Sequence, residues 1–349
     1  YIFSLRHGRQ RITAMRNTMA ITMGDPLGIG PEVVVKAIHE EEETGDLMVV
    51  GDYPILQRAQ ERFAPGKAFY SVASVDEVDP SRPEIPVLHC ASDLPTGDLG
   101  ERGPTAEGGK ASILFIRTAV ELAMEGRVAA VITAPISKEA IHMGGYPYPG
   151  HTEYLAELTN TKRFAMMLAG GSLRVILVTT HCALAEVPRL ITRERIYDIL
   201  EISHEWWIRY LGYPPKLAVA ALNPHGGEGG LFGSEEETHI RPAIDMARSK
   251  GMTVSGPHPS DTLFHFAKDG RFDAVVVMYH DQGLIPLKMI SFGKGVNCTL
   301  GLPIIRTSVD HGTGYDIAWK GKADPSSLRE AIGMARDLVH RRWNAEHGA

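Results

Sequence analysis

The chain alternates between two hydrophobic patterns from residue 19 onward. Short runs rich in Val, Ile, Leu and Ala, without polar alternation, are typical of strands that are covered on both faces. Longer amphipathic stretches between them indicate helices. The strand-like runs lie at residues 20–23, 47–50, 129–133, 174–179, 217–222 and 274–278, and the helical stretches at 31–43, 109–125, 192–211, 235–250 and 326–343. This alternation predicts an α/β/α sandwich with a mostly parallel sheet.

The N-terminal segment differs from the rest of the chain. Residues 1–18 carry four Arg residues, no acidic residue and no apolar segment of the kind found in signal peptides. We expect this segment to be a poorly ordered extension. The total length of 349 residues then leaves residues 19–349 for one large or two fused α/β lobes.

Composition and charge exclude several function classes. The chain is 44% hydrophobic and 22% charged, as in an ordinary globular protein. Its net charge of −6 gives no general attraction to nucleic acid or to an anionic membrane. No apolar run approaches the roughly 18 residues that a membrane-spanning helix needs. The 3 Cys residues lie far apart, which argues against a disulfide framework and predicts a reducing cytoplasm as the location.

Three of the 15 His residues occupy equivalent positions in the pattern. His181, His225 and His280 each lie just beyond the carboxyl end of a predicted strand. Open α/β sheets bind their ligands at this edge, and neutral imidazole is the commonest metal ligand in proteins. Each histidine alone could be a loop residue that is satisfied by a backbone carbonyl. Three in the same position favour a catalytic metal site with open coordination positions.

Other residues near these strand ends are candidates for binding an anion. The sequence Gly-His-Thr-Glu at 150–153 opens a helical stretch, so we expect Thr152 to cap the helix and to contact a phosphate. Lys288, Asn297 and Arg306 would suit a carboxylate or a phosphate ester. The glycine-rich loop at 24–32 matches neither a Rossmann nor a Walker pattern, and a tight strand-helix turn explains it equally well.

Several longer motifs resemble the 4-hydroxythreonine-4-phosphate dehydrogenase family. They follow in order over almost everything after residue 19, and they lie at 23–32, 150–153, 179–181, 223–230, 279–284, 295–297 and 305–313. The segment 24–32 is also similar to the first loop of isopropylmalate and isocitrate dehydrogenases. The segment that begins at His311 is similar to their adenosine-binding loop. The resemblance implies an isopropylmalate dehydrogenase-like fold, in which two lobes share a mostly parallel sheet and enclose the active-site cleft.

The resemblance also implies the roles of individual residues. By this resemblance, the divalent-metal ligands of the chain would be His181, His225 and His280. Its substrate contacts are His151, Thr152, Lys288, Asn297 and Arg306. Its contacts to NAD or NADP are His311, Gly312, Thr313 and Asp316. Such proteins are homodimers whose active site lies at the subunit interface, with metal ligands from both chains. In this sequence Trp319 stands where glycine is frequent in the family.

We therefore hypothesise that the substrate is a phosphorylated 3-hydroxy acid, most specifically 4-hydroxythreonine 4-phosphate of vitamin B6 biosynthesis. NAD(P) would oxidise its C3 alcohol, and the product would then lose CO2. The divalent ion could be Zn, Co, Mn or Mg, because three nitrogens and substrate oxygens suit all four. Lys288 is the first candidate for proton transfer or alkoxide stabilisation, and Asp261 is the second.

Alternatives remain inside and outside this family. The substrate could be 4-phosphothreonate or 4-phosphoerythronate, which lack the amine, or a carboxylated aromatic cis-dihydrodiol. A metallohydrolase would use the same three histidines with Asp261 or Glu228 activating water, but it gives no reason for the loop that begins at His311. A non-catalytic phosphosugar-binding module would need Arg306 and the glycine loops but no metal.

Overall fold

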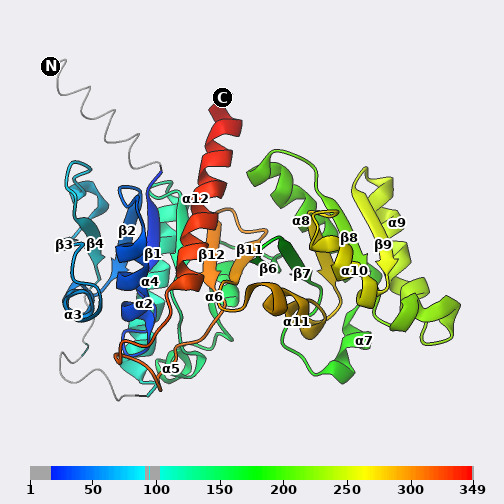
Figure 1. Ribbon diagram of the computed structural model, residues 1–349, viewed down its shortest axis with the longest axis horizontal. Coiled ribbons are helices and arrows are strands. Elements are labelled where there is room, and N and C mark those ends of the chain that lie inside the picture. The colour runs from blue at the N-terminus through cyan, green and yellow to red at the C-terminus, as the bar shows by residue number, and fades with distance from the viewer. Residues whose placement is uncertain (1–16, 91–93, 95–102, 348–349) are drawn as a thin grey trace. The chain divides into compact units, whose positions relative to one another are not determined.

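The computed structural model describes residues 17–90, 94 and 103–347 (Figure 1). The predicted extension at 1–18 therefore lies outside the described residues, apart from its last two positions. The chain divides into two compact units. Unit 1 contains Tyr1–Thr161 and Leu302–Val339, and unit 2 contains Lys162–Gly301 and His340–Ala349. The predicted cleft between two lobes stays a prediction.

The sheet of unit 1 is parallel in each of its strand pairs, in the order β3-β4-β2-β1-β5-β12. The strands are β1 (Met19–Thr22), β2 (Leu47–Gly51), β3 (Phe69–Val72), β4 (Ile85–His89), β5 (Ala130–Thr133) and β12 (Ile305–Val309). Every residue of β1, β2 and β5 is buried, as the unbroken apolar runs predict. The strands β3, β4 and β12 were not predicted from the pattern.

Helices flank this sheet, and glycine allows two of them to approach closely. The helices are α2 (Gly30–Glu40), α3 (Tyr53–Phe63), α4 (Ala106–Met124), α5 (Lys138–Met143), α6 (His151–Leu158) and α12 (Ser326–His347), with a 3₁₀ turn η1 at Val75–Glu77. A Cβ atom at Gly109 of α4 would overlap the backbone carbonyl of Ala140 in α5. Only glycine therefore permits this contact between the two helices.

Unit 2 has a mixed sheet in the order β11-β6-β7-β10-β8-β9. Its strands are β6 (Ala165–Gly170), β7 (Leu173–Leu177), β8 (Lys216–Ala220), β9 (Thr253–His258), β10 (Ala274–Val277) and β11 (Val296–Leu300). The pairs β11–β6 and β6–β7 are antiparallel, whereas β7, β10, β8 and β9 pair in parallel. The predicted α/β fold, with a mostly parallel sheet flanked by helices, is confirmed.

The helices of unit 2 include one whose two ends were predicted from the sequence. They are η2 (Leu184–Glu186), α7 (Val187–Leu190), α8 (Arg193–Leu211), η3 (Pro224–Gly230), η4 (Glu236–Ile240), α9 (Arg241–Ser249), α10 (Ser260–Ala267) and α11 (His280–Ser291). The side chain of Thr192 accepts the amide of Arg195 at the start of α8, and Gly212 ends that helix in the left-handed region at φ 79°. In the described part of the chain, none of the helices combines the length and the apolar character that a membrane span requires.

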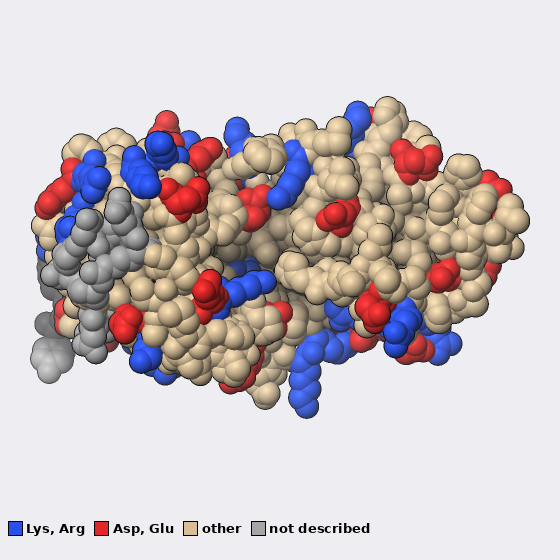
Figure 2. Space-filling view, turned by 90° about the horizontal axis from the view of Figure 1, so that it is seen from below, with Lys and Arg blue, Asp and Glu red and all other residues tan. Residues whose placement is uncertain are grey.

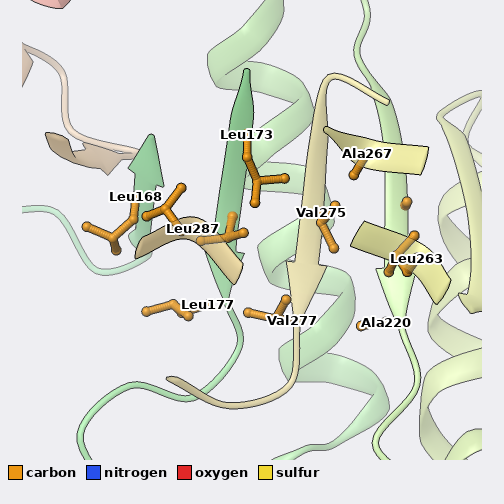
Figure 3. Packing of buried hydrophobic residues seen from close by; sticks show 11 residues of the cluster. Leu168, Leu173, Leu177, Ala220, Leu263, Ala267, Val275, Val277 and Leu287 are labelled. Atoms are coloured by element: carbon orange, nitrogen blue, oxygen red, sulfur yellow. The ribbon is translucent and has the colours of Figure 1, made fainter. Parts of the chain in front are cut away.

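A buried cluster fixes the helices that begin at the carboxyl edge of the unit 2 sheet. Leu287 of α11 and Leu263 of α10 pack with side chains of β6, β7, β8 and β10 (Figure 3). Leu177 and Val277, close to the ends of β7 and β10, belong to the same cluster. The first residues of both helices are thereby held near the strand ends where the sequence predicts a site.

Candidate functional site

Three predicted metal ligands follow three neighbouring parallel strands of unit 2. His181 follows β7, His225 lies in η3 after β8, and His280 is the first residue of α11 after β10. The strands stand in the order β7-β10-β8, so their carboxyl ends meet at one edge of the sheet. The predicted positions of the histidines beyond the strand ends are therefore confirmed, whereas their role as ligands stays a prediction.

His181 and His280 lie close to each other. Their ring centroids are 5.6 Å apart. The Nδ1 atom of His280 lies 2.7 Å from Oδ1 of Asp281. A carboxylate that hydrogen-bonds one ring nitrogen is typical of metal-binding histidines, because it selects the tautomer whose other nitrogen has a free lone pair. His280 therefore has the carboxylate contact of a metal-binding histidine, and His181 lies close to its ring.

His225 belongs to a loop with an unusual backbone. Its own φ is 54° and that of Glu228 is 43°. The four glycines at 226, 227, 229 and 230 also have positive φ values. Nδ1 of His225 lies 2.7 Å from Oε1 of Glu228, which repeats the carboxylate contact of His280. Positive φ at two residues that are not glycine stores backbone strain, which is common at functional sites.

A buried carboxylate holds the start of this loop. Glu236 is only 1% exposed, and its Oε1 accepts the backbone amides of Leu222 at 2.9 Å and Asn223 at 2.7 Å. Its Oε2 accepts the side-chain amide of Asn223 at 2.9 Å. A Cβ atom at Gly227 would lie 2.7 Å from the same Oε2. The contact with Glu236 explains the glycine at 227, and positive φ favours glycine at 226, 229 and 230.

One chain brings together two of the three predicted ligands. Within the described residues, no group of three His, Cys, Asp or Glu side chains is arranged to hold a metal ion. The carboxylates beside His225 and His280 fit the role of these rings as metal ligands. His225, however, does not form a three-ligand group with His181 and His280 among the described residues. The prediction that two subunits share the ligands would account for this separation.

In unit 1, the buried cation Arg306 acts on the half-buried ring of His151. Arg306 of β12 is 2% exposed, and its guanidinium donates to Oγ1 of Thr133 at 2.8 Å. Burial and the Arg306 charge lower the pKa of His151 well below its usual value, so the imidazole is neutral. Its Nε2 is buried and has no hydrogen-bond partner. The other ring nitrogen is held by the backbone of Ala134, so Nε2 of the neutral ring is an acceptor, and the Arg306 guanidinium is the group suited to an anionic oxygen.

The prediction that Thr152 caps a helix is wrong. The helix α6 begins at His151, its N-cap is Gly150, and no side chain caps it. Thr152 is therefore one position inside the helix, where it is 7% exposed. The first-turn backbone amides of α6 still form the positive end of the helix dipole, which is suited to an anion.

The remaining substrate candidates lie on three elements of unit 2. Lys288 is exposed on α11, two helical turns beyond His280. Asn297 lies within β11, and its Oδ1 is buried without a hydrogen-bond partner. Asp261 is exposed in the first turn of α10. Lys288 and Asp261 are therefore open to a ligand, and the amide oxygen of Asn297 is available as an acceptor.

The loop that begins at His311 packs on the glycine-rich loop 24–32. The backbone amide of Ile29 donates to the carbonyl of Thr313 at 2.9 Å, and a Cβ atom at Gly28 would lie 2.8 Å from that carbonyl. Nδ1 of His311 lies 3.0 Å from the carbonyl of Gly312, and its Nε2 is buried without a hydrogen-bond partner. The glycines at 24–32 thus allow two loops from distant parts of the chain to interlock.

Sequence reasoning missed the acidic residues that hold these loops together. The hydroxyl of Tyr315 donates to Asp25 at 2.6 Å, and burial raises the pKa of that fully buried carboxyl although the hydrogen bonds from Tyr315 and from the backbone act to lower it. Glu32 accepts the amides of Gly321 and Ala323 at 3.2 and 2.9 Å. Asp25 and Glu32 were visible only as members of a motif, because their partners lie about 290 positions away.

The residue that departs from the family pattern lies in the same region. Trp319 has a φ of 59°, in the left-handed region that favours glycine. Its indole is buried, donates to the carbonyl of Pro26 at 3.3 Å, and contacts the ring of Phe63 at a centroid distance of 5.8 Å. Asp316 precedes it in the same loop, and its carbonyl accepts the amine of Lys320 at 3.0 Å. The packing of the indole offsets the backbone strain.

The charges on the surface do not form a nucleic-acid interface in the view of Figure 2. Among the described residues on that face, basic and acidic side chains are interspersed over both units, without one continuous basic field. A nucleic-acid-binding surface concentrates Lys and Arg in such a field.

Comparisons with known proteins identify relatives over nearly the whole chain. The family model described as "Pyridoxal phosphate biosynthetic protein PdxA" matches residues 43–335. A 4-hydroxythreonine-4-phosphate dehydrogenase from Desulforapulum autotrophicum is 49% identical, covering 93% of this chain and 96% of that protein. The D-threonate 4-phosphate dehydrogenase of Salmonella typhimurium is 44% identical, covering 92% and 99%. The crystal structure of 4-hydroxythreonine-4-phosphate dehydrogenase from Klebsiella pneumoniae has a TM-score of 0.85 and 43% identity, covering 93% and 99%.

Proposed function

The chain belongs to the PdxA family of pyridoxal phosphate biosynthetic proteins, and we propose that it is an NAD(P)-dependent dehydrogenase that oxidises and decarboxylates 4-hydroxythreonine 4-phosphate. The observation that carries this proposal is the placement of three histidines beyond neighbouring parallel strands, two of them with Nδ1 held by a carboxylate. A hydrolase that uses these residues would leave the interlocked loops at 24–32 and 311–323 without a role.

We assign the metal and the dinucleotide to separate residue sets. His181, His225 and His280 would hold one divalent ion, with subunits of a homodimer sharing the ligands. The ion would supply Lewis-acid polarisation of the substrate oxygens. His311, Gly312, Thr313 and Asp316 would contact NAD or NADP, which supplies the oxidising equivalent. Zn, Co, Mn and Mg all remain candidates for the ion.

The chain's own side chains bind the substrate and move its proton. His151, Thr152 and Arg306 would hold the phosphate, with Nε2 of the neutral imidazole accepting a hydrogen bond from a protonated phosphate oxygen and the guanidinium supplying the charge. Asn297 would accept a hydrogen bond through its buried Oδ1. Lys288 would stabilise the developing charge at the C3 oxygen, and Asp261 is the second candidate for holding that proton.

A second candidate is the oxidation of D-threonate 4-phosphate. The Salmonella typhimurium relative of that name is nearly as similar to this chain as the 4-hydroxythreonine-4-phosphate dehydrogenases are. The two substrates share the phosphate and the C3 alcohol and differ at the amine. 4-Phosphoerythronate and a carboxylated cis-dihydrodiol, which lacks a phosphate, complete the set of alternatives. The cytoplasmic location stays a prediction.

The test is a panel of these compounds with NAD or NADP and each divalent ion, in which reduced nicotinamide is followed by absorbance. The proposal expects the highest kcat/KM with 4-hydroxythreonine 4-phosphate, and loss of turnover on chelation. Higher kcat/KM with D-threonate 4-phosphate would replace the substrate by the second candidate. No reduced nicotinamide with any compound would refute the dehydrogenase.

A matched pair of histidine variants tests the metal ligands. His225→Ala should abolish metal-dependent turnover, whereas His39→Ala, at an exposed histidine in the last turn of α2, should leave it unchanged. The bound metal in each purified variant is measured by elemental analysis. A His225→Ala protein that keeps the wild-type rate in metal-depleted buffer would contradict the assignment.

A further inference from the structure

Gln282 makes hydrogen bonds to three separate elements at the carboxyl edge of unit 2. It is 7% exposed and lies two positions after His280. Its Oε1 accepts the backbone amide of Met278 at 2.6 Å. Its Nε2 donates to the carbonyl of Ala221 at 2.6 Å and to Oγ of Ser260 at 2.8 Å. Each of these partners lies on a segment that carries a proposed site residue.

The three partners mark the ends of the segments that carry the site. Met278 follows β10 and comes two positions before His280, and Ala221 follows β8 and comes four positions before His225. Ser260 is the first residue of α10 and precedes Asp261. One amide side chain therefore fixes the spacing between two strand ends and a helix start.

A second hydrogen bond extends this network to β7. The hydroxyl of Thr179, two positions before His181, donates to the carbonyl of Met278 at 2.7 Å. The backbone of Met278 is thus held on its amide side by Gln282 and on its carbonyl side by Thr179. Thr179 itself is buried. The ends of all three histidine-bearing strands are connected through two buried side chains.

We propose that Gln282 is a positioning residue, which sets the distances between the segments that carry His181, His225 and His280. The inference rests on the proposed function, since it assumes that these histidines bind a divalent ion. An amide suits the task because it offers an acceptor and two donors on one rigid group. A carboxylate of the same shape would keep the bond to Met278 and lose both donors. A methionine of similar length would lose all three bonds.

The proposal is tested by the affinity of the metal-free full chain for Zn²⁺, measured by calorimetry. Gln282→Met should weaken Zn²⁺ binding by about tenfold or more, the range seen when groups that orient metal ligands are removed. Gln282→Glu should also weaken it, and it preserves the shape of the side chain if the Met variant does not fold. Ser260→Ala removes the bond from Gln282 and the bond of the Ser260 hydroxyl to the carbonyl of Ala221 at 3.2 Å. It leaves the bonds of Gln282 to Met278 and Ala221, so it should have a smaller effect.

Ser203→Ala is the matched control for a merely structural effect. Ser203 is fully buried in α8, and its hydroxyl donates to the carbonyl of Ile199 at 2.6 Å, within the same helix. Its removal should lower the stability of unit 2 and leave the Zn²⁺ affinity unchanged. Urea unfolding of each metal-free variant gives the stability for comparison.

The outcomes separate this inference from the proposed function. A wild-type protein that binds no Zn²⁺ would overturn the metal site and the inference with it. Wild-type protein that binds Zn²⁺, with equal affinity in Gln282→Met and Gln282→Glu, would overturn the inference alone. A loss of affinity in Ser203→Ala as large as that in the Gln282 variants would also overturn it, because stability and not strand spacing would then control binding.

Discussion

His151 should make the stability of the protein fall in mildly acidic solution. Burial and the neighbouring Arg306 lower the pKa of His151 in the folded protein, whereas in the unfolded chain it returns to about 6.5. Below that pH the unfolded chain binds a proton that the folded protein does not bind. Unfolding is therefore favoured as the pH falls from 6.5 towards the lowered pKa of the folded state.

The magnitude follows from this difference of one proton. Each pH unit inside the window costs at most about 1.4 kcal/mol of unfolding free energy, so the contribution of His151 at pH 5.5 relative to pH 7.5 reaches at most about 1.4 kcal/mol. Above pH 7 both states carry a neutral imidazole, and the contribution vanishes. The positive charge of Arg306 adds to burial as the cause.

The assay compares the wild type with His151→Asn, which does not titrate and retains an amide donor. Urea unfolding is followed by circular dichroism at pH 7.5, 6.5 and 5.5. The other histidines contribute equally to both proteins, so the difference between the two unfolding free energies isolates His151. We expect this difference to shift by at most about 1.4 kcal/mol between pH 7.5 and 5.5 in favour of the variant. A difference that does not change with pH would refute the reasoning.

Three further predictions concern packing and charge. Gly109→Ala should lower the unfolding free energy by about 2 kcal/mol because the new Cβ overlaps α5, whereas Gly333→Ala, at an exposed position of α12 with open space around it, should raise it by about 0.5–1 kcal/mol. Both changes are measured by urea unfolding, and changes of the same sign in the two variants would contradict the contact. Trp319→Gly should destabilise by about 3 kcal/mol, since the lost burial exceeds the relief of its positive φ, and a rise in the thermal midpoint would show that strain dominates. Arg336→Met should lower the unfolding free energy by about 1 kcal/mol through loss of the ion pair with Asp46 at 2.6 Å. The difference from wild type should shrink in 1 M NaCl, and a difference that does not depend on salt would exclude the ionic explanation.

Local patterns predicted much of the fold. The buried parallel strands were visible as apolar runs because both of their faces are covered, and the helical stretch predicted at 192–211 agrees with α8 to within one residue. The antiparallel strands β6 and β11 were not predicted. Residues 165–170, which form β6, are rich in Ala, Met and Gly, and these residue types do not distinguish a strand from other buried segments.

The sequence alone also determined which residues stand at the candidate site. His181, His225 and His280 could be placed at one sheet edge because parallel strands end together there. Only the tertiary structure decided how that edge is held. The bonds of Gln282 to Ala221 and of Tyr315 to Asp25 join residues 61 and 290 positions apart. Such contacts leave no periodic trace in the sequence, since they depend on where the packed elements bring single polar groups together.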